Sequence, residues 1–166
     1  PYEDLMSVLD NSLSKFNFID KENIFAAGAS YGGFMINWIE GHSDRFNALF
    51  SHDGVYDQSS MYGETEELWF PEWEFKGTPW TNPKLYKKWS PSSYVENFKT
   101  PMLIVQGGHD FRVPEGQAFQ LFTALQRQGV ESKLLYFPNE THFVTKPQNA
   151  KFWWHSLFNW FEQHKK

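Results

Sequence analysis

The residues Gly28-Ala29-Ser30-Tyr31-Gly32-Gly33 follow directly on the apolar run Ile24-Phe25-Ala26-Ala27. A short buried strand that ends in G-x-S-x-G and continues into a helix is typical of a nucleophile elbow, a sharp and strained turn that exposes the serine hydroxyl. We expect glycine at positions 28 and 32 because a side chain there would collide with the neighbouring strand and helix. Apolar residues at helical spacing from Phe34 to Ile39 supply the helix that the motif requires. The motif predicts Ser30 as a nucleophile for covalent hydrolysis.

Apolar patterns on either side of this motif predict an alternation of strands and helices. Strands are expected over Ile24–Gly28, Ala48–Ser51, Met102–Gly107 and Lys133–Phe137. Helices are expected over Tyr2–Lys15, Tyr31–Gly41, Tyr94–Phe98, Pro114–Gln128 and Gln148–His164. Such alternation indicates an α/β fold with a mostly parallel sheet and helices on both faces, in which ligands bind at the carboxyl ends of the strands.

The first helix and the middle of the chain have patterns of their own. The apolar face expected for the first helix consists of Leu5, Leu9 and Leu13, with Val8 and Phe16 beside them. Residues 56–93 are rich in aromatic residues, Pro and Gly, and we expect them to be irregular apart from a helical turn at Glu64–Trp69.

The composition describes a folded domain and excludes several classes of function. A length of 166 residues fits one domain, and 19% of the residues are aromatic. The net charge of -5 gives no reason to expect nucleic acid or an anionic membrane as a partner, and no apolar run is long enough to span a bilayer. Cysteine is absent, which excludes a thiol nucleophile, a disulfide framework and a cysteine zinc site.

A serine nucleophile needs a base, and the base needs a carboxylate that orients it. On an α/β-hydrolase scaffold the chain order is Ser, then Asp or Glu, then His, each in a loop beyond the carboxyl end of a strand. Asp110 follows the predicted strand Met102–Gly107 after two residues, and His142 follows Lys133–Phe137 after four. The sequence therefore predicts a triad of Ser30, Asp110 and His142.

Other titratable residues fit this order less well. Asp53 and Asp57 also follow a predicted strand and are the alternative acids. The remaining histidines precede the acid, adjoin it or fall in the last helix: His42, His52, His109, His155 and His164. No H-E-x-x-H or paired-histidine spacing is present, so we expect neither a metal site nor a cofactor.

The three residues imply a reaction. His142 would take the proton of Ser30 as its Oγ attacks a carbonyl, then return that proton to the leaving group. Asp110 would hold the imidazole in the correct tautomer and stabilise its positive form. The N–H of Tyr31, the first amide after the nucleophile, is one oxyanion donor, and a second donor is expected from a loop after an earlier strand.

Three segments together resemble a known family. G-A-S-Y-G-G, D-F-R-V-P from Asp110 to Pro114 and E-T-H-F around His142 are similar to the carboxyl-terminal catalytic domain of the prolyl oligopeptidase family. The resemblance covers essentially the whole chain, in order and spacing. Within that family, the segments Ser51–Val55 and Glu67–Phe75 most resemble the dipeptidyl-peptidase V branch.

The resemblance implies a serine peptidase that trims short peptides, with a β-propeller domain that restricts entry. It makes Arg112 the residue that contacts a backbone carbonyl of the substrate, although a salt bridge at the rim of the sheet explains this arginine equally well. It makes Val113 and Tyr31 part of the pocket for the residue before the scissile bond. Further aromatic candidates for this pocket are Tyr56, Tyr62, Trp69 and Phe70.

The resemblance also implies that residues 1–166 are a partial α/β-hydrolase domain, with the early strands and the β-propeller absent. We expect such a fragment to be weak or inactive alone, and to associate with the missing amino-terminal part or with copies of itself. A periplasmic or secreted location is favoured by resemblance alone. Two alternatives stay open, namely an esterase or lipase on the same fold and a catalytically incompetent fragment kept for association.

Overall fold

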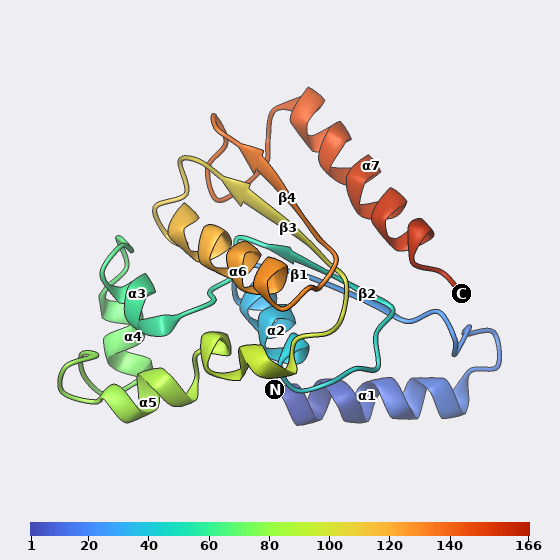
Figure 1. Ribbon diagram of the computed structural model, residues 1–166, viewed down its shortest axis with the longest axis horizontal. Helices are drawn as coiled ribbons and strands as arrows, with labels where there is room; N and C mark the ends of the chain where they lie inside the picture. The colour runs from blue at the N-terminus through green and yellow to red at the C-terminus, as the bar shows by residue number, and fades with distance from the viewer.

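Four parallel strands form a single sheet in the computed structural model, which describes residues 1–166 (Figure 1). In spatial order they are β1 (Phe25–Ala29), β2 (Ala48–His52), β3 (Met102–Gly107) and β4 (Ser132–Phe137). Spatial order equals chain order, so the carboxyl ends of all four strands meet at one edge. The predicted α/β fold is confirmed.

Helices cover both faces of this sheet (Figure 1). The long helices are α1 (Tyr2–Lys15), α2 (Tyr31–Glu40), α6 (Glu115–Arg127) and α7 (Pro147–Gln163). Between β2 and β3 lie four short helices, α3 (Gln58–Tyr62), α4 (Trp69–Glu74), α5 (Pro83–Lys88) and the 3-10 helix η1 (Pro91–Asn97). No helix combines the length and the apolar character that crossing a membrane requires.

The side chains of β3 alternate between two separate cores, because successive residues of a strand point to opposite faces. Met102 and Ile104 pack with α2, η1 and α6, whereas Leu103 and Val105 pack with α7. All four are buried, which is why this strand reads as a continuous apolar run rather than an alternating one. Burial on both faces fixes the register of β3, and with it the position of the loop that starts at Gly108.

The apolar face predicted for α1 is only partly covered. Tyr2 and Met6 pack against the core, but no residue of the helix is fully buried. Leu5 and Val8 are exposed to 46% and 63%. Leu9 and Leu13 of the predicted face are half-buried in line with Tyr2 and Met6, whereas Leu5, Val8 and Phe16 are exposed, so the covered stripe is only partly the predicted one.

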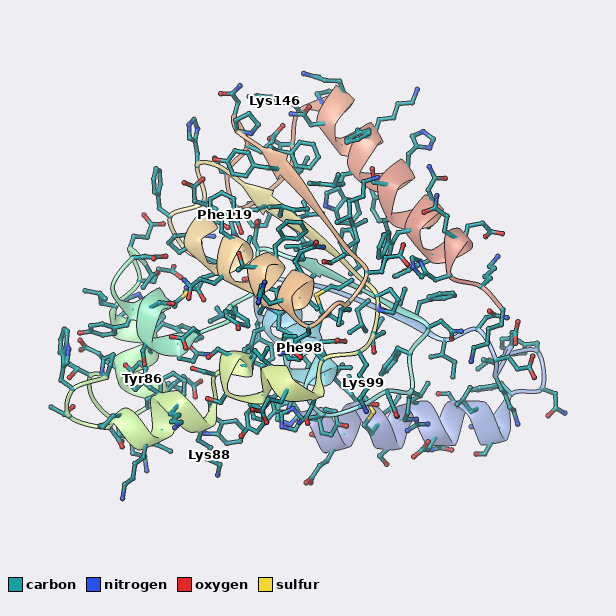
Figure 2. All side chains as sticks on the ribbon, viewed as in Figure 1. Tyr86, Lys88, Phe98, Lys99, Phe119 and Lys146 are labelled. Carbon is teal, nitrogen blue, oxygen red and sulfur yellow. The ribbon has the colours of Figure 1, made fainter.

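The prediction of irregular structure for residues 56–93 was wrong. The segment contains α3, α4, α5 and the start of η1, each too short to give a helical period in the sequence. Aromatic packing holds it together: Tyr86 is completely buried, contacts the ring of Phe75 and donates its hydroxyl to the carbonyl of Gly77 at 2.9 Å. Figure 2 marks Tyr86 in this helical excursion, together with the exposed Lys88 two residues later.

Candidate active site

Ser30 stands between β1 and α2 in the strained backbone that its motif predicts. Its φ and ψ are 59° and -119°, in the left-handed half of conformational space that non-glycine residues rarely adopt. Its N–H donates to the carbonyl of His52 at 2.9 Å, which ties the turn to the end of β2. A strained serine held this way is the geometry of a nucleophile elbow.

Two of the three glycines around Ser30, Gly28 and Gly33, are required by close packing, and Gly32 is not. A Cβ on Gly28 would lie 2.2 Å from the carbonyl oxygen of Gly32, so the first glycine is required as predicted. A Cβ on Gly32 would meet nothing within 4 Å, so the predicted collision at that position is wrong. Gly33 is the second constrained position, because a Cβ there would lie 2.6 Å from the His52 oxygen.

Asp110 lies in the loop after β3, and the backbone of that loop holds it in place. Its Oδ1 accepts the N–H groups of Arg112 and Val113 at 2.9 and 3.0 Å. Its Oδ2 lies 2.7 Å from Nδ1 of His142, within hydrogen-bond distance. Asp110 is 3% exposed as a whole residue, so the hydrogen bonds of its carboxylate form away from bulk water.

His142 sits in the loop after β4, and a buried glutamate closes that loop. Glu140 accepts the N–H of Thr145 at 3.0 Å and that of Lys146 at 3.2 Å, and Asn149 donates its amide to the same carboxylate at 2.6 Å. These contacts join the loop to the first turn of α7, where a carboxylate is stabilised by unpaired backbone N–H groups. The loop that carries His142 is therefore held in place by the hydrogen bonds of Glu140.

The hydrogen bond that His142 donates to Asp110 raises the pKa of His142 above its ordinary value. Partial burial opposes this shift, and the negative charges of Asp110 and Asp53 reinforce it, while Arg112 acts the other way. A raised pKa makes the imidazole a stronger base, which suits the removal of a serine proton.

The two alternative acids have different surroundings. Asp53 is buried, and its Oδ2 lies 3.8 Å from Nδ1 of His142 and 2.9 Å from Nε2 of His52. Burial raises the pKa of Asp53 to about 6. Asp57 instead accepts the N–H of Ser60 at 2.8 Å as the cap of α3 and contacts neither histidine.

Asp53, Asp110 and His142 are the residues that could hold a metal ion, since one ligand atom from each lies within 4.8 Å of the others. Each of these groups already has a protein partner. His142 is hydrogen-bonded to Asp110, and Asp53 accepts the N–H of Gly107 at 3.1 Å. The donor set fits a charge network better than a cation site.

A cavity of about 600 Å³ joins the elbow to the base. Ser30, His142 and the three residues predicted beside them, Tyr31, Arg112 and Val113, all line it. No hydrogen bond joins the Ser30 hydroxyl to His142, and such contacts are often loose without substrate. The N–H of Tyr31 lies in the first turn of α2, where amides have no partner within the helix and can donate to a bound oxyanion.

The predicted aromatic pocket residues divide into two groups. Phe70 lines the cavity. Tyr56 is part of the main core, and the hydroxyl of Tyr62 donates to Glu72 at 2.7 Å away from the cavity. Trp69 is 65% exposed, contacts the ring of Phe70 and does not line the cavity.

Further cavity residues come from α2 and from residues 55–89, which the sequence pattern assigns to the core or to irregular structure. They are Phe34, Met35, Trp38, Val55, Met61, Phe75 and Trp89, with the polar residues Gln58, Glu67 and Glu74. Phe34 and Trp38 lie on the same face of α2 as Ser30, one and two turns on, so their spacing from the elbow could have identified them.

Arg112 lies between the cavity and two carboxylates. It lines the cavity, and its Nε lies 3.9 Å from Glu66 and 3.7 Å from Glu67. The same loop is joined to this segment by a 2.7 Å hydrogen bond from Thr65 to the Arg112 carbonyl. Nearly half of the side chain is exposed, so these ion pairs are weak enough to exchange for a ligand.

Comparisons with known proteins identify a family and several relatives of this chain. A family model described as the prolyl oligopeptidase family matches residues 1–166. The chain is 44% identical to a probable dipeptidyl-peptidase 5 of Aspergillus flavus and 40% identical to a dipeptidyl-peptidase 5 of Schizosaccharomyces pombe, over 99% and 96% of its length. These alignments cover only 23% and 24% of the relatives, so the chain spans about a quarter of their length.

Solved structures agree with this assignment. An acylaminoacyl peptidase of Pyrococcus horikoshii superposes with a TM-score of 0.92 and 28% identity, over 99% of this chain and 28% of that one. A puromycin-hydrolyzing peptidase of Mycobacterium tuberculosis, at 21% identity and a TM-score of 0.90, shares the fold over 99% of this chain and 25% of its own. On the family match, the sequence identities and the shared fold, this chain belongs to the prolyl oligopeptidase family.

Proposed function

We propose that this chain carries the catalytic centre of a serine peptidase that hydrolyses peptide bonds of short peptides, with Ser30, Asp110 and His142 as its triad. The observation that carries the proposal is the 2.7 Å contact between the buried Asp110 and His142, which opens onto the same cavity as the strained Ser30. Family membership and the names of the relatives support the choice of a peptidase.

In the proposed reaction, Oγ of Ser30 attacks the scissile carbonyl while His142 accepts its proton. The imidazolium that forms is stabilised by Asp110, and the developing oxyanion by the N–H of Tyr31. His142 then gives the proton to the leaving amine as the peptide bond breaks. Water attacks the acyl-enzyme, with His142 again as the base, and restores the Ser30 hydroxyl.

The walls of the cavity favour a peptide with an apolar side chain before the scissile bond. Aromatic side chains from α2 and α4, including Tyr31, Phe34 and Phe70, surround the space beside Ser30. Arg112 would donate to a backbone carbonyl of the peptide, exchanging its weak contacts with Glu66 and Glu67 for that bond. The printed names of the relatives favour release of dipeptides over other modes.

We also propose that the activity belongs to a longer protein. The relatives are about four times as long as this chain, and β1, which carries the elbow, is an edge strand of its sheet. A further strand pairing along β1 would cover its open edge, and a loop from that part would supply the second oxyanion donor. Size measurement of this chain with and without the remaining part tests the association, and self-association is the alternative outcome.

The test of the proposed function is hydrolysis by the full natural protein of a chromogenic dipeptide anilide and of a nitrophenyl ester. We expect cleavage of both, with Ser30→Ala removing both activities while the far-ultraviolet circular dichroism stays unchanged. Cleavage of the ester alone would favour an esterase, because an amide needs protonation of its leaving group. Activity that survives Ser30→Ala would reject the triad.

A further inference from the structure

The segment His52–Gly54, at the end of β2, contacts all three loops of the proposed triad. The carbonyl of His52 accepts the N–H of Ser30 at 2.9 Å. Oδ1 of Asp53 accepts the N–H of Gly107, at the start of the acid loop, at 3.1 Å. Gly107 in turn packs so closely on the base loop that a Cβ would lie 2.1 Å from the carbonyl oxygen of Thr141. One short segment therefore connects the nucleophile, the acid and the base.

Asp53 occupies an uncommon backbone conformation at the centre of this junction. Its φ is 46°, in the left-handed region that residues with a side chain adopt only rarely. The side chain is 1% exposed, and its N–H is fixed by the carbonyl of Val105 at 3.0 Å. Backbone strain of this kind persists where surrounding structure fixes it, and it often accompanies function.

The second oxygen of Asp53 faces two histidines. Oδ2 lies 2.9 Å from Nε2 of His52 and 3.8 Å from Nδ1 of His142. The His52 contact is not aligned as a hydrogen bond, and neither atom of that contact has another polar partner. A buried carboxylate oxygen without an aligned donor is expensive unless it interacts with a positive charge. The imidazolium that His142 becomes during the reaction is such a charge.

The titratable groups facing Asp53 come from each element packed on it. They are His52 on β2 itself, Asp110 in the loop after β3 and His142 in the loop after β4. From α7 the ring of Trp153 covers His52 and brings no charge. Arg112 is the positive charge that acts on His142 from the cavity side.

We propose that Asp53 is a positioning residue that acts through His142, holding the base loop against the elbow and stabilising the imidazolium as a second, non-hydrogen-bonded carboxylate. It complements Asp110, which fixes the tautomer of the imidazole by direct contact. This inference rests on the proposed function.

The experiment is the pH dependence of kcat/KM for the full natural protein and its Asp53→Asn variant. Asn keeps the shape and the acceptor for Gly107 but removes the charge. In the wild type, kcat/KM falls as the pH drops and His142 becomes protonated, and this part of the profile is called the acid limb. Because the charge of Asp53 raises the pKa of His142, the midpoint of the acid limb should fall by about one pH unit in the variant. The limb should also become shallower, since Asp53, with its pKa of about 6, no longer titrates beside the base. At pH 8 we expect about a tenfold loss of kcat/KM, because the imidazolium that His142 becomes during the reaction is no longer stabilised by the charge of Asp53.

Two further variants separate this role from a structural one. His52→Gln removes the group that lowers the pKa of Asp53, so Asp53 stays neutral to a higher pH and raises the pKa of His142 less. The midpoint should therefore shift downward, in the same direction as in Asp53→Asn but by less. Asp57→Asn is the matched control, because Asp57 follows the same strand, touches neither histidine and leaves a good helix cap when replaced by Asn. Its profile should superpose on that of the wild type. If Asp53→Asn fails to fold, His52→Gln decides alone, and an unmoved midpoint rejects the inference.

The outcomes also distinguish this inference from the function on which it rests. A wild-type protein that neither cleaves the anilide nor reacts with a fluorophosphonate would reject the proposed function itself. An active wild type whose acid limb is unchanged in Asp53→Asn would reject only the role of Asp53. A lower rate with an unmoved limb would reduce Asp53 to a structural residue and overturn the inference.

Discussion

The loops at the carboxyl end of the sheet and the helical excursion between β2 and β3 border the same cavity but are stabilised differently. In the loops, buried carboxylates accept backbone N–H groups, as Asp110 does from Arg112 and Glu140 does from Thr145. In the excursion, aromatic rings pack around Tyr86. Hydrogen-bonded carboxylates fix directions, whereas aromatic packing fixes mainly volume. Reaction geometry should therefore depend on the loops, and substrate preference on the excursion.

The largest effect should come from the loop side. Asp110→Asn keeps the shape of the acid but lets the imidazole take the wrong tautomer, so kcat should fall by about ten-thousand-fold. The KM should change little, since the cavity walls are untouched. Steady-state kinetics of the full natural protein measure both, and a loss below tenfold would mean that another carboxylate, Asp53 first, is the acid.

The elbow allows a steric test of the same region. Gly28→Ala places a methyl group 2.2 Å from the Gly32 oxygen, so α2 must move away from β1. We expect a loss of about 2–3 kcal/mol in the free energy of unfolding, because overpacking a backbone contact is rarely absorbed. Denaturant titration measures it, with Gly129→Asn as a control at a left-handed, open turn where Asn is tolerated.

Glu40 stabilises the junction where the excursion returns to the sheet. Its Oε1 accepts the N–H groups of Lys99 and Thr100 at 2.7 and 2.9 Å, while Oε2 is buried without a partner. Figure 2 marks Lys99 and the buried Phe98 beside it, at the start of the connection to β3. Burial raises the pKa of Glu40 to about 7, far above its value in an unfolded chain.

The sign of the resulting pH dependence follows from that shift. The folded protein keeps Glu40 protonated up to about pH 7, whereas the unfolded chain loses this proton near pH 4.5, so stability falls between these two values as pH rises. Glu40→Gln should remove about 2–3 kcal/mol of this decline and raise the melting temperature more at pH 8 than at pH 4.5. An equal change at both pH values would contradict the burial of a neutral carboxyl.

The smallest effect should come from the excursion. Tyr86→Phe removes the hydrogen bond to Gly77 but keeps the packed ring, so we expect about 1 kcal/mol less stability and an unchanged kcat. Tyr86→Ala should empty the core of the excursion, raise the KM of apolar substrates and leave the acid limb of the pH profile in place. A shifted acid limb in either variant would show that the two regions are not separate.

Much of the fold could be predicted from the sequence. The strands and long helices have apolar periods over enough residues to be recognised, and β3 was predicted with its exact bounds because Pro101 and Gly107 frame a continuous apolar run. The short helices α3, α4 and α5 are five or six residues long, less than two turns, and long-range aromatic contacts determine them. The exposed face of α1 could not be foreseen, because periodicity shows an apolar face without showing what covers it.

In the candidate site too, some residues could be predicted from the sequence and others depend on contacts between distant segments. The motif, the chain order and the position of loops after strands led to Ser30, Asp110 and His142, and the structure brings the last two within 2.7 Å. The environment of Asp53 could not be read, because its contact with His142 joins loops 89 residues apart. Tyr56 and Tyr62 were predicted for the cavity from their chemistry alone, yet aromatic rings fill cores as readily as pockets.

The most direct measurement is the site of covalent labelling by a fluorophosphonate on the full natural protein, identified by mass spectrometry of its peptides. We predict a single modified residue, Ser30, labelled rapidly in the wild type and at least a thousandfold more slowly after His142→Ala. Modification of a different serine, or equally fast labelling of Ser30 without the imidazole, would contradict a triad assembled from these three loops.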